Sequence, residues 1–306
     1  AANTPLIEVD GIYAKLECAN PCGSIKDRIA KYIIEESEKR GLLRPGMKIV
    51  EATSGNTGIS FAFYAKQKGY SITIVMPENM SSERKQLIRD LGAELILVRA
   101  GDFVEAARLR DEMAQLPNYF NPDQFSNPLN VECHRRTTGR EILQQMKERA
   151  RTIDAFVAGV GTGGTLIGVG QALREINPDV YLAAVEPNES PVMRGGKPGL
   201  HTIGGIGDGF IPKIASGPKN GLHELIQEVI GVSSQDAKET AIYLQEKHGY
   251  CVGMSAGANF VAARGMSRRF KTIVTVFADG YSKYQSLGLR HAGAGRCPYE
   301  DKSRLA

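Results

Sequence analysis

Apolar residues follow two different spacings along the chain, and these spacings alternate. Short apolar runs of strand length are followed by longer segments in which apolar positions recur at helical spacing. Strands are expected at residues 12–17, 48–52, 71–76, 94–98, 155–160, 180–185 and 272–278. Helices are expected at residues 25–39, 57–68, 82–91, 103–115, 141–150, 165–176, 235–247 and 256–268. This alternation predicts βαβ units, a mostly parallel sheet, and a ligand site at the edge where the strands end.

Two stretches interrupt this pattern. The polar stretch 116–130 is rich in Pro and Asn and is predicted to separate two α/β domains, a number that the length of 306 residues also favours. The glycine-rich stretch 194–218 is long for a connection without secondary structure, and such loops are usually functional or mobile. Residues 288–306 show no clear periodicity.

Composition narrows the function classes. The net charge is +4, from 38 basic and 34 acidic residues without long runs, which does not favour nucleic-acid binding. The five cysteines are an odd number without CxxC or zinc spacing, which favours reduced thiols in a cytoplasmic protein. No signal segment and no apolar run of about 18 residues is found, so neither export nor a membrane span is expected. The five histidines form no HExxH motif, so no metal site is expected, and no GxSxG turn suggests a serine hydrolase.

The segment TSGNTG at residues 53–58 follows a predicted strand and opens a predicted helix. Unpaired N–H groups at such a helix start attract anions, and the Thr, Ser and Asn side chains add hydrogen-bond donors. The alternative is a turn that only caps the helix, because Ser, Thr and Asn are good N-cap residues. Six small or polar residues in a row leave both interpretations open.

The segment GTGGT at residues 161–165 has the same position between a strand and a helix. Its glycines let the backbone approach a phosphate, and its threonines can donate hydrogen bonds. Gly159, Gly161 and Gly164 also fit the G-x-G-x-x-G pattern of a dinucleotide site, with Glu186 further along the chain. That alternative leaves Lys26 and the turn at 53–58 unexplained.

Lys26 lies in the first turn of another predicted helix, within PCGSIKDR at residues 21–28. Ser24 is expected as the N-cap residue, with Asp27 at the capping-box position. The positive end of a helix dipole disfavours a lysine and lowers the pKa of its ammonium, as a nucleophilic amine requires. The ordinary alternative is a solvated surface lysine, but the Gly and Ser neighbours and the two anion-binding turns favour a reactive amine.

Taken together, these segments resemble the cysteine synthase family. That family includes O-acetylserine sulfhydrylases and cystathionine β-synthases among the fold-type II pyridoxal-phosphate enzymes. The resemblance extends from residue 3 to about residue 287 and rests on PCGSIKDR, TSGNTG, QFSNPLN (124–130), His134 with TTG (137–139), and GTGGT. It implies an α/β fold with two doubly wound, three-layer αβα domains and the cofactor in the cleft between them. The smaller domain would be 20–130, and the larger would be 1–19 plus 131–306.

The resemblance also implies residue roles. Lys26 would hold pyridoxal 5′-phosphate as a Schiff base and then, as a free amine, remove the Cα proton. Asn56 would hydrogen-bond the ring oxygen of the cofactor. Ser255 would meet the pyridine nitrogen; the alternative is an N-cap of the following helix, and both roles can hold together. A hydroxyl does not keep that nitrogen protonated, so β-elimination through an aminoacrylate is favoured over transamination. The implied phosphate ligands are Gly161, Thr162, Gly163, Gly164 and Thr165, and the implied substrate residues are Thr53, Ser54, Gly55, Asn56, Thr57, Gln124 and Gly207.

Asp208 departs from the family pattern, because sulfhydrylases typically have a small residue at this position of GIGDGF (205–210). A carboxylate there could orient or deprotonate the water or thiol that attacks the aminoacrylate, or it could repel hydrosulfide. The alternative is a turn residue that faces solvent. Arg135 replaces a usual aromatic residue, and Cys22, which replaces a small one, is expected as a small buried thiol rather than a redox sensor.

The sequence therefore predicts a cytoplasmic, homodimeric pyridoxal-phosphate enzyme that acts on a small amino acid. Its first predicted activity is β-replacement, which makes L-cysteine from O-acetylserine, or a similar activated serine, and sulfide. The alternative is a cysteine lyase or hydrolase that releases hydrogen sulfide and gives serine or pyruvate, with Asp208 activating water. Condensation of the cystathionine β-synthase type and a binding protein without turnover are also open. The usual N-terminal extension of the family is absent from the sequence, so the dimer geometry is not implied.

Overall fold

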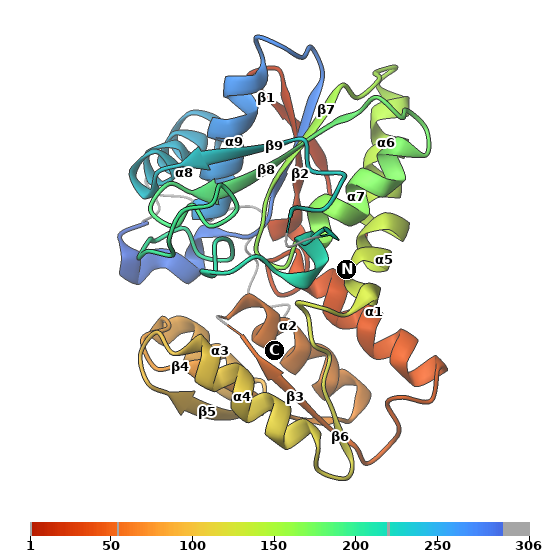
Figure 1. Ribbon diagram of the computed structural model, residues 1–306, viewed down its shortest axis with the longest axis vertical. Helices are drawn as coiled ribbons and strands as arrows, with labels where there is room; N and C mark the ends of the chain where they lie inside the picture. Colours follow the sequence, from red (N-terminus) through yellow and green to blue (C-terminus); the bar gives the residue numbers. More distant parts are fainter. Residues whose placement is uncertain (1, 54, 219–220, 290–306) are drawn as a thin grey trace.

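The computed structural model describes residues 2–53, 55–218 and 221–289, and its strands form two sheets (Figure 1). Across the larger sheet the strands are β1 (Leu6–Val9), β2 (Ile12–Leu16), β10 (Ile273–Phe277), β7 (Ala155–Gly159), β8 (Tyr181–Pro187) and β9 (Glu228–Val232). β1 is antiparallel to β2, and the other neighbouring pairs are parallel. Across the smaller, wholly parallel sheet they are β5 (Glu94–Val98), β4 (Ser71–Pro77), β3 (Lys48–Ala52) and β6 (Tyr119–Phe120).

Helices cover the faces of both sheets. Those associated with the smaller sheet are α1 (Lys26–Lys39), α2 (Asn56–Lys68), α3 (Ser82–Asp90) and α4 (Phe103–Ala114). Next along the chain are α5 (Pro128–Arg136), α6 (Thr138–Glu148), α7 (Gly164–Arg174), α8 (Ser234–His248) and α9 (Met254–Met266). Short 3-10 helices are η1 (Glu17–Ala19), η2 (Lys213–Ala215) and η4 (Tyr281–Leu287). None of the helices in the described parts of the chain is long and apolar enough to span a bilayer.

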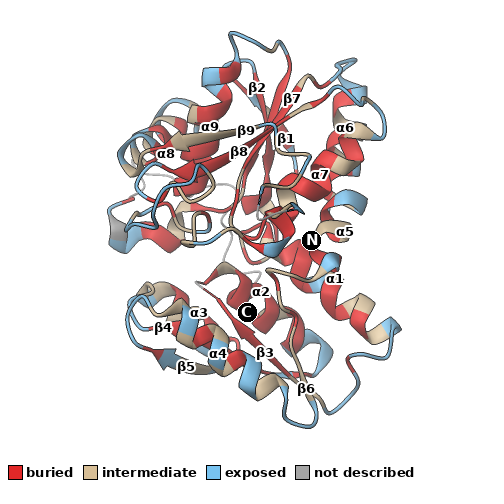
Figure 2. Ribbon diagram, viewed as in Figure 1, coloured by how far each residue is buried: buried red, intermediate tan, exposed pale blue. Residues whose placement is uncertain are grey.

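Successive side chains of a strand point to opposite faces of the sheet. The central strands carry apolar side chains on both faces, so helices cover each sheet on both sides. In β7, Val157 faces a core shared with α8 and α9, whereas Phe156 faces a core shared with α6 and α7. In β3, Ile49 faces α1 and α2, whereas Val50 faces α4. The central strands are buried and the outer sides of the helices are exposed (Figure 2). The predicted α/β class with two doubly wound, three-layer units is confirmed.

Some elements differ from the predicted ones. β1, β6, β9 and α5 were not expected, and α6 begins three residues before the predicted helix at 141–150. β6 has only two residues, and four of the five residues of the edge strand β9 are only partly buried, so neither has a distinct apolar pattern. α5 begins where Asn127 caps it and Pro128 takes its first position. The domain boundaries at residues 20 and 130 stay a prediction.

Candidate active site

The loops at the carboxyl ends of parallel strands from both sheets line one cleft. β3 leads into the turn that opens α2, β7 leads into the loop that opens α7, and β10 ends beside the start of α1. The predicted site residues that line the cleft are Lys26, Asn56, Thr57, Gln124, Gly161, Thr162, Gly163, Thr165, Asp208 and Ser255. Thr53, Gly55 and Gly164 belong to the turns behind it, and Gly207 borders an adjoining outer cavity. Ser54 lies outside the described residues.

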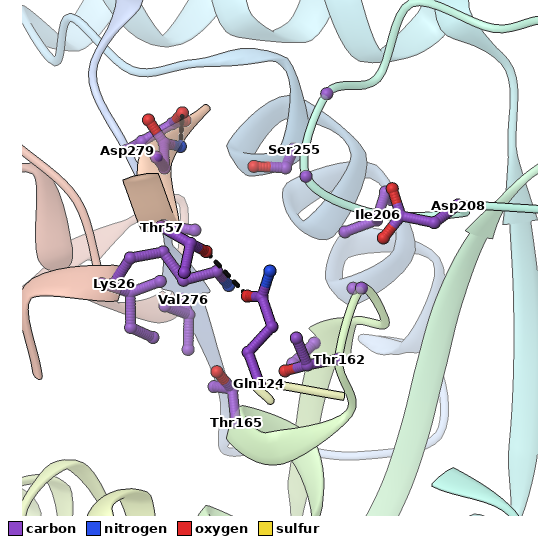
Figure 3. A pocket seen from close by; sticks show the side chains of 18 of the residues that line it. Lys26, Thr57, Gln124, Thr162, Thr165, Ile206, Asp208, Ser255, Val276 and Asp279 are labelled. Carbon is purple, nitrogen blue, oxygen red and sulfur yellow. Dashed lines mark hydrogen bonds between the residues drawn. The ribbon is translucent and has the colours of Figure 1, made fainter. Parts of the chain in front are cut away.

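Lys26 is the first residue of α1, and its side chain lies in the cleft (Figure 3). Burial lowers the pKa of its ammonium, and the carboxylates of Asp208 and Asp279 oppose that shift. The amine therefore releases its proton at a lower pH than an exposed lysine would. The backbone fixes this helix start, because the Ile25 N–H donates to the Ala278 carbonyl at 2.8 Å.

The start of α1 differs from the predicted capping box. Ser24 lies one residue before the N-cap position, although its Oγ accepts a hydrogen bond from the Lys26 N–H at 3.3 Å. The Asp27 carboxylate accepts from the Cys22 N–H at 2.7 Å and from the Ser60 hydroxyl at 2.6 Å. Asp27 therefore ties the segment before Lys26 to α2 instead of closing the helix end.

The loop after β7 presents a cradle of backbone N–H groups at the start of α7. Gly163 is the N-cap residue, with a left-handed φ of 86° that favours glycine. A Cβ on Gly161 would lie 2.3 Å from the Gly205 carbonyl oxygen, and one on Gly164 would lie 1.9 Å from Asn130 Oδ1. Larger residues do not fit here, and free N–H groups at a helix start are suited to bind a phosphate.

The two threonines of this loop are held by residues from the other predicted motifs. Thr162 Oγ1 accepts a hydrogen bond from Asn130 Nδ2 at 3.0 Å. Thr165 Oγ1 lies 3.3 Å from His134 Nε2. Burial keeps the pKa of His134 well below its ordinary value, so the ring is neutral. The segments around residues 130 and 134 thus support the loop from α5.

The turn after β3 and Gln124 form one hydrogen-bonded unit. Thr57 Oγ1 donates to Gln124 Oε1 at 2.7 Å (Figure 3). Thr53 Oγ1 accepts from the Gly55 N–H at 3.0 Å. Gln124 Nε2 in turn donates to the Ala52 carbonyl at 3.4 Å. Hydroxyl, amide and backbone donors from distant segments therefore meet at the cleft wall.

Asp279 is a cleft residue that the sequence analysis missed. Its Oδ2 accepts hydrogen bonds from Asn56 Nδ2 and from the Tyr284 hydroxyl, both at 2.7 Å. Asn56 Oδ1 is buried and has no partner among the described residues. The signal for Asp279 was its place directly after the predicted strand 272–278, at the edge where ligands bind.

Glu51 is a second missed carboxyl, and it lies beneath the turn after β3. It is fully buried and accepts hydrogen bonds from the Ala52 N–H at 2.9 Å and the Gln124 N–H at 3.3 Å. Burial raises its pKa to about 7, against the opposing attraction of Arg110. Nothing in the local sequence distinguishes this glutamate from a strand residue that faces solvent.

Ser255 and Asp208 lie on the wall that the larger sheet contributes (Figure 3). Ser255 is the second residue of α9 and is buried; Gly253 is the N-cap residue, so the capping alternative for Ser255 is wrong. Asp208 is partly buried, and its Oδ2 lies 3.8 Å from the position of an added Cβ on Gly161. Burial raises the pKa of the Asp208 carboxyl, with Lys26 opposing the shift.

The other two departures from the family pattern lie apart from the cleft lining. Arg135 pairs with Glu175 at 2.6 Å on the surface. Cys22 is buried, and burial raises the pKa of its thiol, so the reactive thiolate is disfavoured. Both features are consistent with structural roles.

Comparisons with known proteins agree with this geometry. The family model described as pyridoxal-phosphate dependent enzyme matches residues 1–279. A cysteine synthase from Staphylococcus aureus is 44% identical over 282 residues, which cover 91% of this chain and 88% of that protein. The chain belongs to the pyridoxal-phosphate-dependent enzymes of the cysteine synthase family.

Solved structures extend this family assignment. Cysteine synthase from Entamoeba histolytica has a TM-score of 0.86 at 35% identity, covering 99% of this chain and 92% of that one. A hydrogen sulfide-producing enzyme from Fusobacterium nucleatum has a TM-score of 0.85 at 40% identity, covering 93% and 85%. The family fold is therefore shared with enzymes named for making cysteine and for releasing sulfide.

The cleft fits pyridoxal phosphate as the cofactor of this family member. It combines an amine of lowered pKa with a glycine cradle that added Cβ atoms would fill. Asn56 Oδ1 and Asn259 Oδ1 are buried there without a partner among the described residues. Buried polar atoms without partners are costly unless a ligand satisfies them, which matches a polar ring bound in this cleft.

Proposed function

We propose that this protein makes L-cysteine by β-replacement, joining an activated serine such as O-acetylserine to sulfide. The observation that carries the proposal is the amine of Lys26, whose pKa is lowered and which lies in one cleft with the turns that open α2 and α7. The relatives named cysteine synthase, from Staphylococcus aureus and Entamoeba histolytica, support this pair of substrates.

The protein chain supplies groups that bind the cofactor and substrate, and one amine that accepts a proton and later returns it. Pyridoxal phosphate, when bound, withdraws electrons from Cα of the amino acid and so acidifies its proton. Lys26 Nζ would take that proton, which requires a neutral amine, and its lowered pKa favours this form. The β-leaving group would depart with its electron pair, hydrosulfide would add at Cβ, and Lys26 would return the proton to Cα.

The remaining residues would orient the cofactor and the substrate. The N–H groups of Gly161–Thr165 would hold the phosphate, and Asn56 would bond the ring oxygen. Thr57 and Gln124, with the turn after β3, would bind the substrate carboxylate. Ser255 would face the ring nitrogen with a neutral hydroxyl, which favours loss of a β-leaving group over storage of charge in the ring.

A second candidate function is release of hydrogen sulfide from L-cysteine, with water adding to give serine. Asp208 supports it, because its carboxyl has a raised pKa, lines the cleft and interacts with Lys26. A carboxyl of raised pKa can take a proton from water at a pH where an exposed aspartate is too weak a base. The similar hydrogen sulfide-producing enzyme from Fusobacterium nucleatum supports the same direction.

Product analysis separates the two functions. The purified protein is incubated with O-acetylserine and sulfide in one arm and with cysteine alone in the other. We expect cysteine in the first arm, and its loss in Lys26→Ala but not in Lys31→Ala, which removes an exposed lysine from the same helix. Cysteine formation that survived in Lys26→Ala would refute the proposal.

The second arm tests Asp208. Sulfide and serine formed from cysteine, and lost in Asp208→Asn but not in Asp179→Asn at an exposed turn, would establish the sulfide-releasing function. Equal sulfide release by the wild type and by Asp208→Asn would remove Asp208 from that reaction.

The expected homodimer and the cytoplasmic location also remain proposals. The family assignment supports a small amino acid as substrate. The resemblance to the family motivates the dimer, and the reduced-thiol composition motivates the compartment. Sedimentation equilibrium of the full chain tests the first, and localisation of the tagged protein tests the second.

A further inference from the structure

An outer cavity adjoins the cleft on the side of Asp208. It has a volume of about 620 Å³ and lies between loops of the smaller sheet and the glycine-rich loop of residues 198–209. The residues that line both spaces are Arg84, Gly204, Gly205, Ile206 and Asp208. The outer cavity therefore leads into the cleft, and hydrosulfide, which has a single heavy atom, does not need this space.

Arg84 lies where the two spaces meet. It belongs to α3, and only 8% of its surface is exposed. Its Cδ lies 2.3 Å from the position of an added Cβ on Gly55, and its guanidinium carbon lies 4.9 Å from the ring centre of Tyr284. Its side chain also forms a hydrogen bond with Tyr284, but its Nε has no partner among the described residues, and no ion pair found there includes Arg84.

Within residues 2–53, 55–218 and 221–289, this arrangement leaves the positive charge of Arg84 without a paired carboxylate. A guanidinium removed from water is unfavourable unless it is paired, and the face of an aromatic ring compensates only in part. Asp208 borders the same two spaces, but no ion pair joins it to Arg84 among the described residues.

His201 provides a second unpartnered nitrogen in the wall of the outer cavity. Its Nε2 donates to the Gly207 carbonyl at 2.8 Å, because a carbonyl oxygen only accepts. Its Nδ1 is buried and has no partner among the residues that the structure describes. The same cavity therefore holds two buried nitrogens without a partner in the described parts of the chain.

We propose that the outer cavity binds an acceptor thiol larger than hydrosulfide that carries an anionic group, and that Arg84 recognises this group. The inference rests on the proposed β-replacement. Overall, a C–S bond replaces the bond between Cβ and the leaving group, the leaving group departs with its electron pair, and the thiol proton passes to solvent. Arg84 acts on the specificity for the acceptor and takes no part in proton transfer.

The test uses two thiols of equal chain length that differ in charge, 3-mercaptopropionate and 3-mercapto-1-propanol, with O-acetylserine as donor and sulfide as reference acceptor. We expect kcat/KM for the anionic thiol to exceed that for the neutral thiol by about tenfold, the size of one charge-assisted hydrogen bond. The preference should appear in KM for the thiol. Arg84→Gln should abolish this ratio, and Arg84→Lys should keep part of it.

Arg89→Gln is the matched control, because it removes the same charge from an exposed position of the same helix. It should keep the wild-type ratio. A wild type without charge preference overturns the proposal, whether or not the Arg84 variants fold. An Arg84→Gln variant that keeps the preference, or that raises KM for O-acetylserine in place of KM for the thiol, also overturns it.

Binding without turnover separates this inference from the proposed function. The unreactive thioether 3-(methylthio)propionate is titrated into the holoenzyme and followed by ligand-observed NMR. We expect its Kd to rise about tenfold in Arg84→Gln and to stay unchanged in Arg89→Gln. An unchanged Kd in Arg84→Gln overturns the recognition of the anion, whereas absence of cysteine formation with sulfide overturns the β-replacement.

Discussion

The buried carboxyl of Glu51 makes the stability of this protein depend on pH. Glu51 lies beneath the turn after β3, where it accepts hydrogen bonds from the N–H groups of Ala52 and Gln124. Burial raises its pKa from 4.5 to about 7. The perturbation that isolates it is Glu51→Gln, which removes the titrating group and keeps the size of the side chain.

The direction of this pH dependence follows from the number of protons that the folded and unfolded states bind. Between these two pKa values the folded protein holds a proton on Glu51 that the unfolded chain has released. The stabilising contribution is therefore fully present below pH 4.5 and is lost as the pH rises through about 7. Between about pH 5 and about pH 8, the free energy of unfolding should fall by about 2 to 3 kcal/mol through this group.

Urea titrations followed by circular dichroism at a series of pH values measure this effect. Glu51→Gln also loses one hydrogen-bond acceptor, but this loss changes the free energy of unfolding by the same amount at every pH. The test therefore uses only how the difference between wild type and Glu51→Gln changes with pH. Other titrating groups are present in both proteins and cancel. Glu8→Gln, at an exposed position of β1, is the control and should follow the wild type.

The reasoning is refuted if the difference between wild type and Glu51→Gln stays constant within about 0.5 kcal/mol over this pH range. That result would mean that water solvates Glu51 as it does a surface carboxylate. The packing of Gln124 over this carboxyl would then be wrong.

Two further predictions concern the cofactor. Gly161→Ala should raise the Kd for pyridoxal phosphate at least about tenfold in equilibrium dialysis, because its methyl group meets the Gly205 carbonyl. Gly265→Ala, where an added Cβ has open space, should keep that Kd and raise the free energy of unfolding by about 0.5 kcal/mol; equal effects on the Kd would contradict the cradle. Asp279→Asn removes a carboxylate that raises the pKa of Lys26, so the cofactor-free protein should take up pyridoxal phosphate at lower pH than the wild type. An unchanged pH dependence of that uptake would show that Asp279 does not act on the amine.

The alternation of apolar runs and helical segments was sufficient for the fold class, because parallel strands buried on both faces are apolar along their whole length. It was insufficient for the edges of the sheets. β6 pairs through two residues, and β9 is an edge strand that is mostly only partly buried, so neither has a distinct period. α5 was missed since its first turn lies inside a Pro- and Asn-rich stretch that reads as a linker.

The site residues also fall into those that the sequence could predict and those that it could not. Lys26, the turn at 53–58 and the loop at 161–165 could be found because each is a contiguous segment with its own chemistry. For Asp279 the position directly after the predicted strand 272–278 was the one available sign, and Arg84 had none, because the importance of both depends on which distant segments meet. Asp279 hydrogen-bonds Asn56, which lies 223 residues earlier in the chain. Arg84 in α3 lies over the ring of Tyr284 in η4. A single sequence carries no local sign of such contacts.

The central claim is that the amine of Lys26 carries the cofactor in this cleft. Borohydride reduction of the purified protein, followed by proteolysis and mass spectrometry, locates the attached pyridoxyl group directly. Lys283 is an internal comparison, because it is also buried but donates to the carbonyls of Cys22 at 2.9 Å and Gly23 at 3.2 Å. The account predicts the label on Lys26 and an unmodified Lys283. A label on Lys283, or a folded protein without any label, would contradict it.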